Sequence, residues 1–256
     1  MATLKKKLKQ HVLTVGSWIT LGDSYMAEIM AKAGFDWIVI DMEHSAITIE
    51  RAAHLIQLIN LCGVPVLVRV GENNPNIIKR VMDAGADGVI VPNVNSPGEA
   101  RRAVESVKYP PLGKRGVGLF RAQGYGRAFD RYRTWLPWES IVIIQIEHIQ
   151  AVQHIDAIFA VDGVDAFIIG PYDLSGSMGL TGQLTHPKVE AVVKKVLRAA
   201  EDNKIVAGYH SVPCDFQEAA KRIKQGFRFL GFSLDTIFFQ DKVTESLAYL
   251  RKSIKQ

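Results

Sequence analysis

The sequence has few cysteines and no long apolar run. Only two of its 256 residues are cysteines, Cys62 and Cys214, which is too few for the disulfide framework of a small secreted protein. The longest apolar runs, such as 37–40 and 141–144, are far shorter than the roughly 20 residues of a membrane-spanning helix. Segment 1–13 lacks the apolar core of a secretory signal. We therefore expect a cytoplasmic protein that makes no use of a membrane.

The sequence also lacks a broad excess of one charge. Its net charge of +5 comes from 31 Lys and Arg against 26 Asp and Glu, and seven of those basic residues with one acid fall in segment 108–133. A nucleic-acid-binding protein more often has a broad basic face or a reading motif, and neither is present. We expect no nucleic-acid partner. The basic segment is a solvated loop or a local anion site, in which Arg115 or Arg121 reaches an acidic substrate or a neighbouring subunit.

A weak internal repeat indicates the fold class. Four segments begin with a glycine that follows a helical pattern and continue into an apolar run: 34–40, 85–91, 163–169 and 226–232. The glycine suits the left-handed end of a helix, and consecutive apolar residues are typical of a strand that is covered on both faces. The repeat therefore predicts helices that alternate with buried parallel strands.

The other apolar runs complete a series of eight strands and eight helices, which predicts a (β/α)₈ TIM-type barrel as a single domain over residues 1–256. An open doubly wound sheet is the rival fold, but no Gly-x-Gly-x-x-Gly follows the first strand. Residues 109–140 form one long irregular stretch. We expect helices to begin at Asp23, Asn74, Ser96, His186 and Asp215. The predicted strands are 14–19, 37–41, 65–69, 88–92, 141–146, 166–169, 205–209 and 229–232. The predicted helices are 23–33, 48–61, 75–83, 96–107, 150–159, 187–202, 215–225 and 235–252.

Ionisable residues follow several of these strands, at the end where a barrel carries its active site. Glu147 and Asp173 follow neighbouring strands, so both carboxylates could hold one hard cation such as Mg²⁺ or Mn²⁺. His44 is a suitable proton acceptor, and Arg69 can stabilise negative charge on an oxygen. The turn 170–173 offers backbone N–H groups to a carboxylate. This set predicts metal-assisted proton abstraction next to a carbonyl group.

No lysine falls within a predicted strand. A Schiff-base mechanism needs a lysine of depressed pKa inside the barrel, so this chemistry is disfavoured. Each assignment also has a structural alternative: Glu147 as a solvated acid, His44 as a helix cap, and Arg69 as an ion-pair partner of Asp41 or Glu43.

Five motifs in the same order resemble the HpcH/HpaI family of class II pyruvate aldolases, which includes 2-dehydro-3-deoxyglucarate and 4-hydroxy-2-oxoheptanedioate aldolases. The resemblance covers nearly the whole chain. The motifs are Asp41-Met42-Glu43-His44, Val68-Arg69, residues 110–118, Gln145-Ile146-Glu147 and residues 170–179.

The resemblance implies reversible cleavage of a 2-oxo-4-hydroxy acid to pyruvate and an aldehyde, in carbohydrate-acid or aromatic catabolism. It implies a divalent cation, Mg²⁺ or Mn²⁺ or a related ion, as cofactor, and a homohexamer whose last helix packs on a neighbouring subunit. The residues carried over are His44 as base, Arg69 as transition-state stabiliser, Asp83 as the acid that raises the basicity of His44, Glu147 and Asp173 as metal ligands, Gln145 and Tyr172 with Asp173 as pyruvate contacts, and Ser211 and Val212 as part of the wall that meets the aldehyde.

Two other functions stay open. A related lyase or condensing enzyme could use acyl-CoA or oxaloacetate in citrate- or malate-type chemistry. A non-catalytic barrel that binds a small dianion is the third hypothesis, because fold does not fix function.

Overall fold

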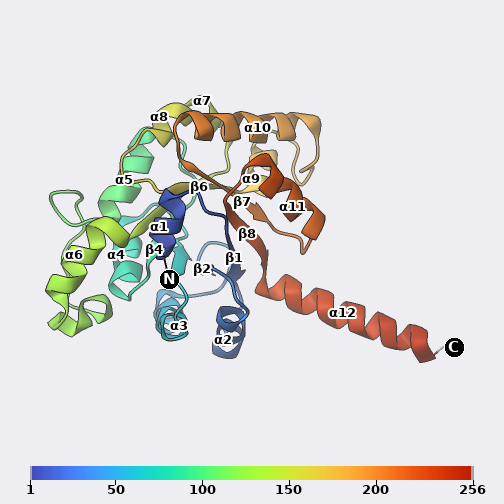
Figure 1. The fold of residues 1–256 in the computed structure, drawn as a ribbon, viewed down its shortest axis with the longest axis horizontal. Coiled ribbons are helices and arrows are strands. Elements are labelled where there is room, and N and C mark those ends of the chain that lie inside the picture. Colours follow the sequence, from blue (N-terminus) through green and yellow to red (C-terminus); the bar gives the residue numbers. More distant parts are fainter. Residues whose placement is uncertain (1, 255–256) are drawn as a thin grey trace.

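A computed structural model describes residues 2–254 as one closed barrel of eight parallel strands, paired in the order of the sequence from β1 round to β8 (Figure 1). Register is continuous between neighbours, except for an irregularity between β1 and β8 at Gly16–Trp18. The strands are β1 Thr14–Ile19, β2 Trp37–Asp41, β3 Val66–Arg69, β4 Gly88–Val91, β5 Ile141–Ile146, β6 Ala166–Ile169, β7 Val206–Ser211 and β8 Phe229–Leu234. The predicted (β/α)₈ barrel is confirmed, and the open-sheet rival is wrong.

Helices surround the barrel, and the five predicted start residues all cap one. The side chains of Asp23, Asn74, Ser96, His186 and Asp215 each accept a hydrogen bond from a backbone N–H in the first turn. The helices are α1 Leu4–Lys9, α2 Ser24–Lys32, α3 Ile49–Leu61, α4 Pro75–Asp83, α5 Pro97–Val107, the 3₁₀ helix η1 Arg121–Gly126, α6 Phe129–Glu139, α7 Ile149–Gln153, α8 Ile155–Phe159, α9 Pro171–Ser177, α10 Pro187–Asp202, α11 Phe216–Gln225 and α12 Asp235–Ile254.

The expectation of an irregular stretch at 109–140 is wrong, because η1 and α6 occupy most of it. Tyr132 and Leu136 of α6 are buried, and Tyr132 stacks on Trp135 with ring centroids 5.4 Å apart. These contacts stabilise a helix that contains Pro137. The predicted helix 150–159 is two short helices, α7 and α8, which meet at His154.

Large side chains fill the barrel interior. Trp37 stacks on Phe229 with ring centroids 4.0 Å apart. Gly16 makes room for this stack, since a Cβ there would lie 2.0 Å from the Trp37 ring. Helix α1 closes the end at which the strands begin: Leu4 and Leu8 join the same interior cluster. The carboxyl end of the barrel is therefore the open end.

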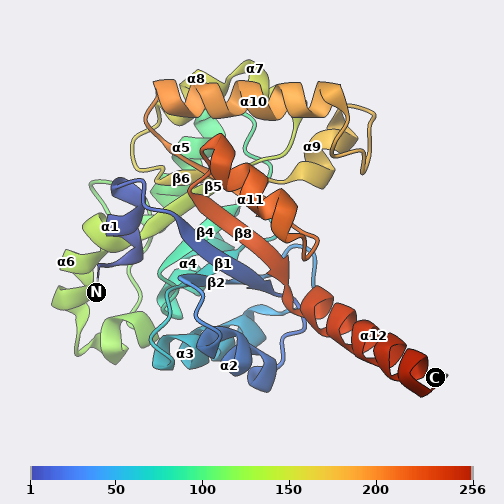
Figure 2. The same ribbon diagram turned by 45° about the vertical axis from the view of Figure 1, so that its right-hand side comes forward.

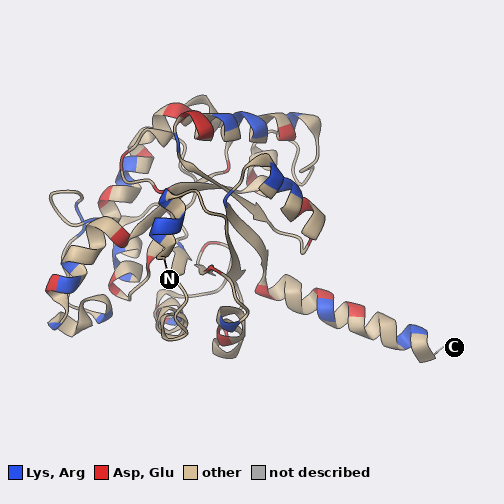
Figure 3. Cartoon of the chain, in the orientation of Figure 1, with Lys and Arg blue, Asp and Glu red and all other residues tan. Residues whose placement is uncertain are grey.

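Helix α12 projects away from the barrel (Figure 2). Charged residues of both signs are interspersed over the outer helices, α12 included (Figure 3). From Phe239 onward every described residue of α12 is exposed, including Phe239, Val243, Leu247 and Leu250. Within residues 2–254, no helix combines the length and apolar character needed to span a membrane.

Candidate active site

A cavity of about 430 Å³ opens at the carboxyl end of the barrel. Successive side chains of a strand point to opposite faces. Every second residue, counted from one in the barrel interior, therefore points into this space. The cavity is lined by Thr20, Asp41, His44, Arg69, Gln145, Ile168, Ile169, Gly170, Pro171, Tyr172, Asp173, His210, Val212, Leu234 and Thr236. Six of the predicted site residues (His44, Arg69, Gln145, Tyr172, Asp173 and Val212) meet here.

Arg69, at the end of β3, is held by two acids of the neighbouring strand end. Its Nε and Nη2 donate to the two oxygens of Asp41 at 2.9 and 2.6 Å. Its Nη1 lies 3.2 Å from Oε2 of Glu43. Burial alone would raise the pKa of Asp41, but the hydrogen bonds and charge of Arg69 outweigh it and lower that pKa. Arg69 thus forms the expected ion pairs with Asp41 and Glu43, and it also lines the cavity.

Glu147 follows β5, and its carboxylate lies beside β6. Its Oε1 accepts the N–H of Asn93 at 2.6 Å, and Gln145 donates to its Oε2. Burial raises the pKa of Glu147, and the charge of Asp173 raises it further. Gly170 packs directly against this pair, because a Cβ at this position would lie 2.9 Å from both Gln145 Nε2 and Glu147 Oε2. Asp173 therefore lies close enough to Glu147 for its charge to act on that carboxylate.

Glu43 is a buried acid that the sequence analysis left without a role. Burial raises its pKa to about 7, with further increases from Glu147, Asp41 and Asp173 and an opposing effect of Arg69. Its Oε2 is buried and has no hydrogen-bond partner. No signal in the sequence separates Glu43 from an ordinary strand-end acid, because its burial depends on the loop that follows β2.

These acids fit a divalent cation. The charges of Glu147, Asp41 and Asp173 raise the pKa of Glu43, the charge of Asp173 raises that of Glu147, and one buried oxygen of Glu43 lacks a hydrogen-bond partner. Within residues 2–254, no three His, Cys, Asp or Glu side chains are placed together as a complete metal site. Two carboxylates suit Mg²⁺ or Mn²⁺, which keep waters and take oxygens from a ligand.

His44 lies at the mouth of the cavity. Its side chain is 61% exposed, and its Nε2 is 3.9 Å from Oε2 of Glu43. Its backbone N–H donates to Asp41 at 3.4 Å. The helix α3 begins later and is capped by Thr48, so the alternative role of His44 as a helix cap is wrong. An exposed imidazole beside a buried acid can exchange a proton with a bound ligand.

The chain matches a known family over most of its length. Residues 14–241 match the model of the HpcH/HpaI aldolase/citrate lyase family. The chain belongs to this family. It is 35% identical to a 2-keto-3-deoxy-L-rhamnonate aldolase of Klebsiella pneumoniae over 98% of the chain and 94% of that protein. A HpcH/HpaI family structure from Burkholderia cenocepacia superposes with a TM-score of 0.93 at 31% identity, over 97% of this chain and 98% of that one. The citrate synthase SbnG superposes with a TM-score of 0.86 at 28% identity, over 99% of each.

Membership of the HpcH/HpaI family confirms the resemblance and makes this protein an enzyme, a carbon–carbon lyase. The hypothesis of a non-catalytic barrel loses its support. Among the described residues, none of the eight strands contains a lysine. Lys108, whose pKa burial lowers to about 8, bonds Ser140 at the start of β5 and so lies at the opposite end of the barrel from the cavity.

Three predicted residues do not line the cavity of this HpcH/HpaI barrel: Asp83, Ser211 and Glu147, whose carboxylate packs against Gln145 and Gly170. Asp83 ends α4, where it accepts a hydrogen bond from Arg115 at 2.5 Å, and it makes no contact with His44 among those found in residues 2–254. Ser211 is buried but points to the outer face of β7, and the inward position is that of His210. Alternation from the interior residue Val206 could have identified His210.

Arg115 and Arg121, the two arginines of the basic segment that were expected to reach a ligand or a neighbour, are bound within the chain. Arg115 is fully buried and also donates to the hydroxyl of Tyr132 at 2.9 Å. Arg121 donates to Asn60 and to the carbonyl of Ala84. The expectation that Arg115 reaches a substrate is therefore wrong for this arrangement, because its guanidinium is needed to pair Asp83.

Proposed function

We propose that this enzyme catalyses the reversible aldol cleavage of a 2-oxo-4-hydroxy acid to pyruvate and an aldehyde, with a divalent cation as cofactor. The carrying observation is the arrangement of one rim: Glu147 and Asp173 follow neighbouring strands, and Arg69 and His44 border the same cavity. Family membership and the aldolase name of the Klebsiella relative support the same reaction class.

Glu147 and Asp173 would hold the cation, and Mg²⁺ or Mn²⁺ best suits oxygen donors alone. When bound, a divalent cation would act as a Lewis acid towards the oxo group of pyruvate. Gln145 donates to Glu147 and so fixes the direction of its carboxylate. We propose that Gln145 and the backbone N–H of Tyr172 and Asp173 also contact the pyruvate carboxylate.

His44 would transfer the proton, and Arg69 would stabilise the negative charge that develops on the substrate. In the cleavage direction His44 takes the proton of the C4 hydroxyl, the C3–C4 bond breaks, and the aldehyde leaves. The electron pair of that bond remains as the enolate of pyruvate. Nε and Nη2 of Arg69 are bound to Asp41. Nη1 lies 3.2 Å from Glu43 and carries two N–H groups, one of which would donate to the enolate oxygen. Protonation at C3 completes pyruvate.

We also propose that the active enzyme is a homo-oligomer, a hexamer as the resemblance implies. Asp83 lies outside the cavity of its own chain, so an action on His44 requires the histidine of a second copy. Helix α12 presents exposed apolar side chains such as Val243, Leu247 and Leu250. Packing of α12 on a neighbouring subunit would remove them from water.

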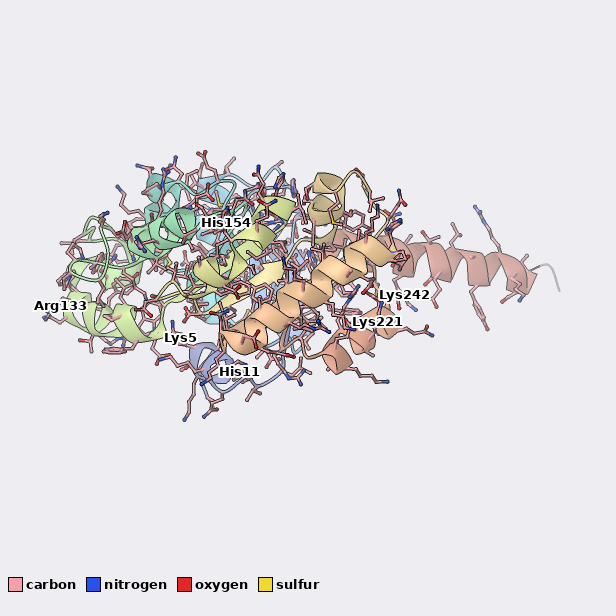
Figure 4. The ribbon with its side chains drawn as sticks, turned by 90° about the horizontal axis from the view of Figure 1, so that it is seen from above. Lys5, His11, Arg133, His154, Lys221 and Lys242 are labelled. Atoms are coloured by element: carbon pink, nitrogen blue, oxygen red, sulfur yellow. The ribbon has the colours of Figure 1, made fainter. Side chains whose placement is uncertain are left out.

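Exchange of the pyruvate methyl protons for deuterium, followed by NMR, tests the enolate chemistry without any aldehyde. We expect exchange with Mn²⁺ or Mg²⁺, loss of exchange in EDTA, and recovery when the metal is restored. The variant His44→Ala should lose aldol cleavage. His154→Ala is the matched control, because His154 is exposed between α7 and α8 (Figure 4) and does not line the cavity. Exchange and cleavage that survive complete metal removal would contradict the proposal.

Likeness to the citrate synthase SbnG favours a second candidate, a citrate-type condensation. The same rim could stabilise an enolate derived from acetyl-CoA and direct it to oxaloacetate. Incubation with acetyl-CoA and oxaloacetate, read as citrate by mass spectrometry, separates the two functions. Citrate formation at a rate that exceeds aldol cleavage would favour the second.

A further inference from the structure

The cavity has two chemically different sides. The acids and Arg69 come from β2, β3, β5 and β6. The remaining arc of the barrel, from β7 through β8 to the end of β1, contributes a wall without a formal charge. This uncharged wall consists of Thr20, His210, Val212, Leu234 and Thr236. The pyruvate half of a substrate belongs beside the acids that hold the cation, so the uncharged wall faces the aldehyde half.

His210 is held firmly in this wall. Its side chain lies in β7 with 8% of the residue exposed, and its ring stacks on Trp18 with centroids 4.6 Å apart and planes 25° apart. Its Nε2 lies 3.3 Å from the carbonyl oxygen of Ser233. A carbonyl oxygen only accepts hydrogen bonds, so Nε2 carries the hydrogen and Nδ1 is left as an acceptor.

The other ring nitrogen, Nδ1, is not fully buried. Nδ1 makes no hydrogen bond among those found in residues 2–254, and it is absent from the fully buried polar atoms that lack a partner there. The ring stays neutral, because burial and then the charge of Arg69 lower the pKa of His210 to about 3. A neutral Nδ1 in a cavity accepts a hydrogen bond from a ligand hydroxyl group.

The surroundings of the wall disfavour a second carboxylate on the ligand. Asp235 lies behind Thr20 and accepts its backbone N–H at 2.9 Å and its hydroxyl at 2.6 Å. A carboxylate in this part of the cavity would be repelled by Asp235 and would find no cation among the wall residues. Val212 and Leu234 instead offer apolar surface to a short carbon chain.

We propose that His210 is a specificity-determining residue that accepts a hydrogen bond from a hydroxyl group on the aldehyde half, so that the enzyme takes short, neutral hydroxyaldehydes. This inference rests on the proposed aldolase function. A site that hydrogen-bonds a substrate hydroxyl discriminates against the analogue that lacks it, because the buried acceptor would then be left unpaired.

The test compares matched aldehydes in aldol addition to pyruvate with Mn²⁺. The probes are 2-hydroxypropanal, propanal and 4-oxobutanoate, which respectively carry a hydroxyl group, no further polar group and a carboxylate. We expect kcat/KM to be at least about 10-fold higher for 2-hydroxypropanal than for either of the others.

The variant His210→Phe keeps a flat ring against Trp18 and removes the acceptor, so the preference for 2-hydroxypropanal over propanal should fall about 10-fold. His210→Asn places an amide oxygen near the position of Nδ1 and should keep part of the preference. It also tests the inference if the phenylalanine variant fails to fold. Ser211→Ala is the matched control, since Ser211 points away from the cavity, and its preference should equal that of the wild type.

Two results would overturn the inference: a wild type that prefers propanal or 4-oxobutanoate, and histidine variants that keep the full wild-type preference. Deuterium exchange of pyruvate alone separates this failure from that of the proposed function. Normal exchange without a hydroxyl preference refutes only the role of His210, whereas absence of exchange and of every aldol product refutes both.

Discussion

Gly170 offers a direct test of where the metal ligand lies. The substitution Gly170→Ala adds a Cβ that would lie 2.9 Å from Oε2 of Glu147, whereas ordinary van der Waals contact begins at 3.4 Å. The backbone at Gly170 has φ −90° and ψ 94°, outside the left-handed region, so alanine fits the backbone. The carboxylate of Glu147 must therefore move by about 0.5 Å, more than the roughly 0.2 Å that metal–ligand distances tolerate.

We expect the apparent Mn²⁺ dissociation constant to rise about 10- to 100-fold in Gly170→Ala, which corresponds to about 1.4–2.7 kcal/mol. The measurement is titration of Mn²⁺ against the rate of deuterium exchange into pyruvate, with calorimetric titration of Mn²⁺ alone. Gly176→Ala is the control on the same helix, because its nearest contact would be Thr181 Oγ1 at 3.6 Å. A folded Gly170→Ala variant with wild-type Mn²⁺ affinity would refute the assignment of Glu147 as a ligand.

Three further predictions concern charge and assembly. Arg69→Met should abolish pyruvate exchange and reduce the free energy of unfolding by about 3 kcal/mol, measured by urea denaturation, because it leaves Asp41 buried without a cation. Leu247→Asp should lower the molecular mass found by light scattering, and an unchanged mass would exclude α12 from the interface. Burial lowers the pKa of Lys108 from 10.5 to about 8, so the unfolded state binds more protons between these values and stability should rise with pH through that window. Lys108→Met should remove that rise, as read from paired denaturation curves at pH 7 and 10.

The barrel itself could be predicted because its signals are local. Three of the four glycines of the repeat end a helix and precede a run that is buried on both faces, as in Gly85, with φ 101°, before β4. Capping residues such as Asp23 and Ser96 mark the other end of the helices. Neither signal depends on contacts between distant parts of the chain.

Elements that depend on distant contacts were missed. Helix α1 is six residues long, too short to be stable alone, and it is fixed by contacts such as that of Lys5 Nζ with the carbonyl of Ser140 at 2.8 Å. Helix α6 contains a proline and depends on the burial of Tyr132 and Leu136. No periodic pattern in segments 1–13 or 109–140 indicates these helices.

The candidate site shows the same division. Residue type and strand order were enough to bring Glu147, Asp173, Arg69 and His44 to one rim. The errors came from side-chain direction: the predicted strand ended at residue 209, so the alternation that turns His210 inward and Ser211 outward lay beyond it. The role of Asp83 stays a prediction, because it depends on a second copy of the chain.

The balance of charge in the cavity explains why its two sides differ. Arg69 is the sole arginine or lysine among the residues that line the cavity, and Asp41 already neutralises it through two hydrogen bonds. Glu43, Glu147 and Asp173 therefore leave a negative excess. Burial raises the pKa of Glu43 to about 7, and the charges of Glu147, Asp41 and Asp173 add to that effect. A divalent cation would offset most of that excess and would draw the negative half of a substrate to this side. The uncharged wall around His210 would then recognise the hydroxyl groups on the aldehyde half of the substrate, which the cation does not contact.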